Sequence, residues 1–158
     1  MRFANAVAGL SAVLALSGFF GVAAHAQDEQ VARMRTALAA PARPAADKER
    51  DAVRKPIETV QLLGIQSGQT VIDVIAAGGW FTEVLSAAVG PMGKVLAQNP
   101  DFFVQREGFV ANEKARHDRL GNVQAVHGEL AANRVEGADA AITALNLHDI
   151  YNGQNGEA

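Results

Sequence analysis

The residues best able to do chemistry lie where a short apolar run turns sharply into a helical pattern. The β-branched run over residues 71–75 contains Asp73. Small residues let a ligand approach the backbone closely, and the first amides of a helix point at it with the positive end of the helix dipole. We therefore predict a site for a carboxylate or phosphate group at this turn, with a plain strand-to-helix connection as the alternative. Four small residues form the turn and an aromatic residue follows them: Ala76, Ala77, Gly78, Gly79 and Trp80.

A second group of polar side chains follows the last apolar run of the chain. His148 is a candidate general base, because imidazole titrates near neutral pH, and Asp149 would orient it or contact a substrate. A surface pair or a local cap is the alternative for both. His117 and His127 have no metal-ligand spacing with His148, and the sequence predicts no metal site.

The periodicity of the chain predicts the elements that must position these residues. Apolar runs predict strands at residues 71–75, 95–97, 123–126 and 139–145. Helical spacing predicts helices over 57–63, 80–89 and about 101–120, the last of them imperfect at Gly108. This alternation predicts the α/β class, with a parallel sheet that is truncated after about the fourth strand and preceded by helices. Ligands of such sheets bind beyond the carboxyl ends of the strands, where both polar groups lie.

The first 26 residues have the three parts of a secretory signal peptide. Arg2 gives a positive start, an uncharged run extends from residue 3 to residue 24, and Ala24-His25-Ala26 is a small–x–small cleavage pattern. We predict cleavage after Ala26 and export to the periplasm or the exterior, with no stable membrane anchor left. An uncleaved anchor is the alternative.

The rest of the chain divides into three parts. Residues 27–56 are predicted to form an N-terminal helical segment, with helices over 28–40 and 47–54, the second with a mostly solvated charged face. Residues 57–151 are predicted to form an incomplete α/β domain, and residues 152–158 a disordered tail.

Composition excludes several classes of function. The 158-residue chain has 49% hydrophobic and 20% charged residues, which is the balance of a globular domain. It has no cysteine, so disulfides, thiolate catalysis and cysteine-ligated metals are excluded. The formal net charge of −3 gives no basic footprint, and no nucleic-acid partner is expected.

The stretch from Val71 to Glu83 resembles the first motif of class I S-adenosylmethionine-dependent methyltransferases. The string Gly-Gly-Trp-Phe-Thr-Glu at 78–83, together with residues 50–59, resembles exported bacterial proteins described as predicted methyltransferases. The resemblance extends from about Asp47 to Tyr151. It implies a Rossmann-like fold with the strand order 3-2-1-4-5-7-6, S-adenosylmethionine as cofactor, and a small-molecule methyl acceptor.

The resemblance assigns the first turn to the cofactor. Asp73 matches the acid of the motif and Gly79 its last glycine, so the segment from Ala76 to Trp80 would bind the cofactor. Ile75 and Ala77 stand where the family has glycines, and a Cβ at these places disfavours a positive φ and crowds a close ligand. Trp80 either lines the ligand pocket or packs on the sheet.

The resemblance also assigns the other strand ends. Asn99 would hold the ribose hydroxyls, where the family has an acid whose charge would strengthen the grip. Glu129 would lie near the adenine amino group or be an exposed loop acid. Asn146 would bind the amino group of the ligand, or it would only close the turn after the fourth strand. Glu83 lies in the first turn of a helix, where its carboxylate would interact favourably with the helix dipole or contact a ligand.

Two functions remain open at this point. The first is methyl transfer from S-adenosylmethionine to an unidentified small acceptor; the alternative is a non-catalytic binding or interaction module on a degenerate or truncated methyltransferase fold. A nicotinamide-dinucleotide domain fits less well, because its glycines and its acid are incomplete here. The fold of the family continues beyond a fourth strand, so the chain is either a fragment or a short form. In the short form, a protein partner or self-association would cover the exposed edge of the fourth strand.

Overall fold

A parallel four-stranded sheet forms the centre of the molecule. The computed structural model of the chain describes residues 11–129, 132–133 and 136–146. The strands lie in the order β3-β2-β1-β4, and every neighbouring pair is parallel. The predicted α/β class and the first four positions of the expected strand order are therefore confirmed. The strands are β1 (Thr70–Val74), β2 (Lys94–Asn99), β3 (Val123–His127) and β4 (Ala140–Thr143).

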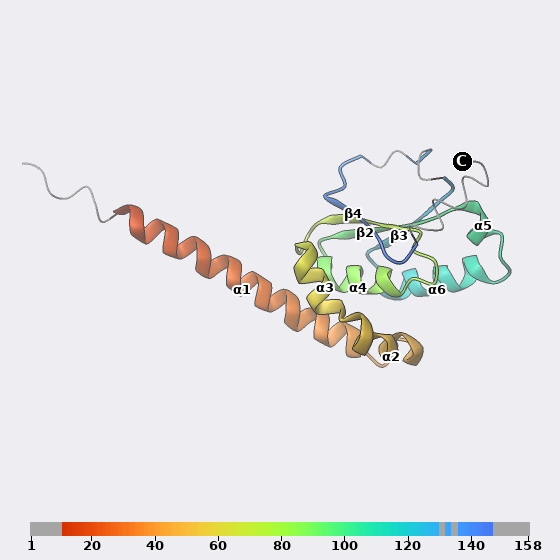
Figure 1. Cartoon of the computed structure of the whole chain (residues 1–158), viewed down its shortest axis with the longest axis horizontal. Helices are drawn as coiled ribbons and strands as arrows, with labels where there is room; N and C mark the ends of the chain where they lie inside the picture. Colours follow the sequence, from red (N-terminus) through yellow and green to blue (C-terminus); the bar gives the residue numbers. More distant parts are fainter. Residues whose placement is uncertain (1–10, 130–131, 134–135, 147–158) are drawn as a thin grey trace, which may run out of the picture.

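Helices connect the strands and lie against one face of the sheet (Figure 1). Helix α4 (Trp80–Val89) joins β1 to β2, and it packs on both strands. The predicted helix over about 101–120 is divided at Gly108, which has a φ of 73°. Its two parts are α5 (Asp101–Val104) and α6 (Phe109–Leu120), and α6 packs on β3.

The order of the strands creates a switch point at β1. The chain runs from β1 outward to β2 and β3, and then returns to place β4 on the opposite side of β1. The carboxyl ends of β1 and β4 therefore lie side by side at the point where the strand order reverses. In open α/β sheets this is the place where a crevice for a ligand forms.

The core lies between the sheet and the N-terminal helices. All ten residues of α4 are buried, which is typical of a helix that is covered on every side. Helix α1 (Ser11–Ala39) covers its outer surface with Met34 and Leu38, and the side-chain amide of Gln30 donates to Ile65 and Ala88 carbonyls at 2.9 and 3.0 Å. Two shorter helices complete this layer, α2 (Ala45–Arg54) and α3 (Pro56–Leu63).

The N-terminal helix is longer than its sequence pattern predicts. A helix was expected over 28–40, whereas α1 runs without a break from Ser11 across the predicted cleavage site at Ala26. Its N-terminal half projects away from the rest of the molecule (Figure 1). Within the described part of the chain, none of the helices combines the length and the apolar character needed to cross a membrane.

Candidate functional site

The turn between β1 and α4 has a left-handed backbone at alternate residues. Ile75, Ala77 and Gly79 have φ values of 55°, 48° and 76°. The side chains of Ile75 and Ala77 were expected to disfavour such values, so the structure differs from the expectation. A non-glycine residue in this region costs about 1–3 kcal/mol and persists only where its surroundings hold it.

Hydrogen bonds from β2 and from the segment after β4 hold this turn. The Ile75 amide donates to Gln98 Oε1 at 3.1 Å, and the Ala77 amide donates to Asn99 Oδ1 at 2.7 Å. Asn146 Nδ2 donates to the Ile75 carbonyl at 2.7 Å. Strand β2 and the segment that follows β4 thus supply partners for Ile75 and Ala77, and these bonds offset the strain.

Asp73 lies at the inner side of the turn with 2% of its surface exposed. Its Oδ2 accepts a hydrogen bond of 2.6 Å from the Thr82 hydroxyl, and the Thr82 backbone amide is a second donor. Burial raises the pKa of Asp73 from 3.8 to about 7, against the two bonds from Thr82, which favour the charged form. The motif acid is therefore neutral in a large part of the molecules at neutral pH.

Asn99, the predicted ribose ligand, is already part of a chain of hydrogen bonds. It is 1% exposed, and its Nδ2 donates to Glu113 Oε1 at 2.9 Å while its Oδ1 accepts from Ala77. The other oxygen of Glu113 contacts His127 Nε2 at 2.7 Å. The amide at the end of β2 thus supports the turn, and the carboxylate beside it comes from α6.

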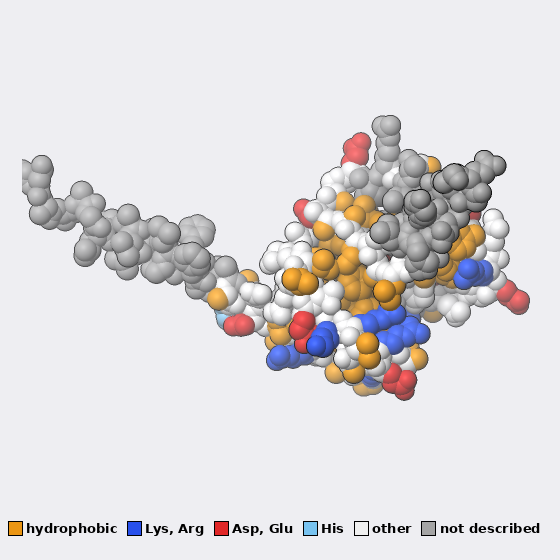
Figure 2. Space-filling view, viewed as in Figure 1, with side chains coloured by type: hydrophobic (Ala, Val, Ile, Leu, Met, Phe, Trp, Pro, Cys, Tyr) orange, Lys and Arg blue, Asp and Glu red, His pale blue; other side chains and the backbone are white. Residues whose placement is uncertain are grey.

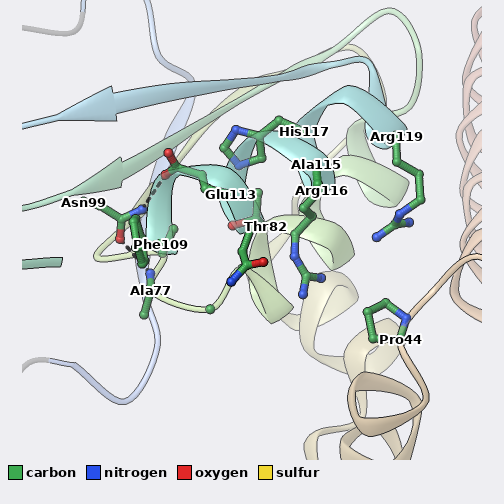
Figure 3. Close-up of a pocket in the computed structure, with 14 residues that line it drawn as sticks. Pro44, Ala77, Thr82, Asn99, Phe109, Glu113, Ala115, Arg116, His117 and Arg119 are labelled. Atoms are coloured by element: carbon green, nitrogen blue, oxygen red, sulfur yellow. Dashed lines mark hydrogen bonds between the residues drawn. The ribbon is translucent and has the colours of Figure 1, made fainter. Parts of the chain in front are cut away.

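Two cavities flank the turn and share its four small residues. The larger has a volume of about 500 Å³ and lies between the turn and α6, within the usual size range of ligand pockets. Figure 3 shows Ala77, Asn99, Phe109 and Glu113 at one end of this cavity and Pro44 and Arg119 at the other. The smaller cavity, of about 190 Å³, lies at the switch point, between the turn and the segment 144–146 that follows β4.

Glycine is required at one position of the turn and leaves open space at another. A Cβ at Gly79 would lie 2.8 Å from Arg116 Cδ, and its φ is positive. A Cβ at Gly78 would meet no atom within 4 Å, and Gly78 lines both cavities. Gly78 is therefore where a ligand could come nearest to the backbone.

A buried cluster of charges lies behind the larger cavity. Glu83, which is 3% exposed, accepts hydrogen bonds from Arg116 and Arg119 at 2.5–2.9 Å. Arg116 also donates to Asp47 at 2.8 Å. Asp47 is buried, so it is an exception to the mostly solvated face that was predicted over 47–54. The sequence suggested two roles for Glu83, a favourable interaction with the helix dipole or contact with a ligand. Neither role included the ion pairs with these arginines.

Trp80 is fixed by the N-terminal helical segment. Its indole N–H donates to the Asp47 carbonyl at 3.0 Å and to Asp51 Oδ1 at 3.1 Å. The residue is 4% exposed, and it forms part of the wall of the smaller cavity. It thus packs in the core and borders the candidate site at the same time.

The remaining predicted residues have different positions. Asn146 lines the smaller cavity, and Ala76 lines both. Glu129 follows β3, is exposed, and lines neither cavity, so its contact with adenine stays a prediction. His148 and Asp149 lie outside the described residues, and their catalytic role stays a prediction.

Glu113 and His117 reach the larger cavity although the sequence pattern did not select them as site residues. They follow Phe109 at helical spacing and share its face of α6. Partial burial lowers the pKa of His117. Within the described ranges, no group of three or more His, Asp or Glu residues is arranged to hold a metal ion.

Comparison with solved structures finds similarity to methyltransferases. The chain matches a SAM-dependent methyltransferase from Aquifex aeolicus, with a TM-score of 0.52 and 25% identity, over 68% of this chain and 59% of that one. An O-methyltransferase from Thermotoga maritima has a TM-score of 0.49 and 20% identity, over 63% of this chain and 40% of that one. No protein-family model and no curated sequence matches. The chain thus spans about three fifths of the Aquifex protein, and it has the Rossmann-like α/β fold of class I methyltransferases.

Proposed function

We propose that the chain binds S-adenosylmethionine across the turn Ala76–Gly79 and transfers its methyl group to a small-molecule acceptor. One observation carries the proposal: the left-handed residues 75, 77 and 79 alternate as the glycines of the class I motif do, at a switch point with a cavity on each side. The similarity to the Aquifex methyltransferase supports it. A plain connection between strand and helix needs neither the strained backbone nor the cavities.

The donor set around the turn fits such a ligand. In the larger cavity, Glu113 provides carboxylate oxygens that can accept from ribose hydroxyls, in the place that the resemblance gives to Asn99. Phe109, in the same cavity, offers an aromatic surface for the base. The smaller cavity, with Asp73 and Asn146, is left for the methionine part.

When bound, the cofactor would supply a methyl group activated by a positively charged sulfur. The work of the chain is then to orient the ligand and to exclude water, which contributes much of the rate in such displacements. Trp80 and Phe81 line the smaller cavity and provide an apolar wall. The acceptor would approach from the side of Asn146, which lies two residues before the predicted base His148 in the chain.

Titration of S-adenosylmethionine into the full chain, followed by calorimetry, tests this proposal. We expect saturable binding in the wild type and its loss in Gly78→Leu, because the added side chain projects into the space that both cavities share. The substitution touches no protein atom at its Cβ, so the thermal melt should be unchanged. Gly78→Ala, the smaller step, should weaken binding less.

Two results would count against the proposal. One is a folded wild-type chain that does not bind S-adenosylmethionine or its demethylated product. The other is binding that Gly78→Leu leaves intact, which would place the ligand elsewhere. Binding without methyl transfer to any acceptor would favour the non-catalytic module instead.

We also propose that the chain is exported and cleaved after Ala26, on the pattern Ala24-His25-Ala26. Expression in a bacterial host should give a periplasmic product whose N-terminal residue is Gln27, as read by intact-mass measurement. Ala26→Leu should block cleavage and leave the uncleaved chain in the membrane fraction, because a large residue does not fit the cleavage pattern. Uncleaved wild-type protein in the membrane would favour the anchor.

A further inference from the structure

Arg54 differs from the other arginines around the site in its partners. Arg43, Arg116 and Arg119 each contact at least one carboxylate. Arg54 has no carboxylate within 4 Å among the described residues, and its guanidinium lies 4.8 Å from the centre of the Trp80 ring. A cation that lies on an aromatic face and has no counter-ion keeps its hydrogen-bond donors available.

The ring that supports Arg54 is itself fixed. Trp80 is 4% exposed, and its N–H is held by Asp47 and Asp51 of the same helix, α2. The guanidinium is therefore kept at one place at the edge of the smaller cavity before any ligand arrives. Such preorganisation lowers the entropic cost of binding an anion.

The smaller cavity has an excess of positive charge. Arg50 and Arg54 both line it, and Arg50 is 53% exposed with only a loose contact of 3.5 Å to Asp47. Among the described residues of its wall the one acid is Asp73, whose raised pKa of about 7 leaves it partly neutral. Figure 2 shows blue side chains gathered over α2, next to the orange side chains between α2 and the sheet.

We propose that the smaller cavity is a carboxylate subsite, in which Arg54 and Arg50 bind the carboxylate of a small ligand. The planar guanidinium of Arg54 matches a carboxylate with two parallel hydrogen bonds. A carboxylate, with one negative charge, fits better than a doubly charged phosphate because the carboxyl group of Asp73 lies in the same wall.

This inference rests on the proposed function for the identity of the ligand. The carboxylate has two possible sources, the methionine part of the cofactor or the methyl acceptor. The two sources predict different losses when the cation is removed. Arg54→Gln removes the charge and leaves a shorter, polar side chain.

The matched control is Arg106→Gln. Arg106 also lies on an aromatic ring, with its guanidinium 4.4 Å from the centre of Phe103, and it lines neither cavity. Its replacement removes an equivalent cation–π contact away from the site. Circular dichroism melts of both variants verify that they fold.

Calorimetric titrations of three probes into the full chain separate the sources. S-adenosylhomocysteine carries the carboxylate, 5′-methylthioadenosine lacks it, and succinate is a carboxylate alone. If the cofactor supplies the group, Arg54→Gln weakens S-adenosylhomocysteine about tenfold and leaves methylthioadenosine unchanged. If the acceptor supplies it, both nucleosides bind as before, and succinate binding to the S-adenosylhomocysteine-saturated chain is lost.

Other outcomes overturn the inference. An equal loss for both nucleosides would mean that Arg54 acts through Trp80, and no loss for any probe would mean that it binds no carboxylate. Similar losses in Arg106→Gln would also overturn it. If the wild type binds neither nucleoside, the proposed function fails, and succinate alone decides: binding that Arg54→Gln removes supports the subsite, and its absence overturns it.

Discussion

Replacement of Glu83 by alanine is expected to lower the free energy of unfolding by about 3–5 kcal/mol, the usual cost of breaking a buried ion pair from one side. Glu83 is 3% exposed and accepts hydrogen bonds from Arg116 and Arg119. Arg43 Nε lies 3.9 Å from it, on a side chain with no exposed surface. Among the described residues this buried nitrogen has no hydrogen-bond partner. Without Glu83, Arg119 loses its carboxylate partner, and Arg116 and Arg43 each lose one of two neighbouring carboxylates.

Urea unfolding followed by circular dichroism at neutral pH measures this loss. The control is Asp118→Ala, which breaks the Lys114–Asp118 pair of 2.6 Å. Both of its side chains are more than 60% exposed, and such pairs contribute less than about 1 kcal/mol. Similar losses in the two variants would show that the buried cluster is no more important than a surface pair.

The elements with the strongest apolar pattern could be predicted from the sequence. The helix over 80–89 was predicted with the bounds that α4 has, because an apolar run lies between two glycine-containing turns. The strands were predicted to within a few residues, and the strand order followed from the resemblance. Local composition decides such elements, so one sequence is enough to find them.

The charged cluster could not be predicted because its members are far apart in the chain. Glu83 lies 33 residues from Arg116, and Asp47 lies 69 residues from it. Each of them belongs to a polar stretch that, taken alone, is typical of a solvated helix face. Only the packing of α2 and α6 against the start of α4 brings these charges together and buries them.

The turn shows a different limit of sequence reasoning. The rule that a positive φ favours glycine predicts that Ile75 and Ala77 disfavour a left-handed backbone. The structure keeps the left-handed backbone at both residues, with partners from Gln98, Asn99 and Asn146. Tertiary hydrogen bonds, which a local rule does not include, hold the backbone between the two cavities in this conformation.

The free energy of unfolding is expected to fall as the pH rises from about 4 to about 7, because of Asp73. Its pKa is about 7 in the folded chain and 3.8 in the absence of the fold. Between these values the folded state holds a proton that the unfolded state has released, so stability falls with pH. The fall amounts to roughly 1.4 kcal/mol per pH unit, reaches at most about 4 kcal/mol, and is complete above pH 7.

Asp73→Asn isolates this contribution from the other carboxylates. The amide resembles the protonated acid, and its oxygen can still accept from the Thr82 hydroxyl, 2.6 Å away in the wild type. Urea unfolding at a series of pH values should show that the free energy of unfolding of the variant rises relative to that of the wild type from pH 4 to 7. Above pH 7 the difference between them should be constant. Asp118→Asn, at an exposed site, should show no such trend. A difference between Asp73→Asn and wild type that does not depend on pH would mean that Asp73 is ionised in the fold despite its burial, because only a proton held by the folded state produces the slope.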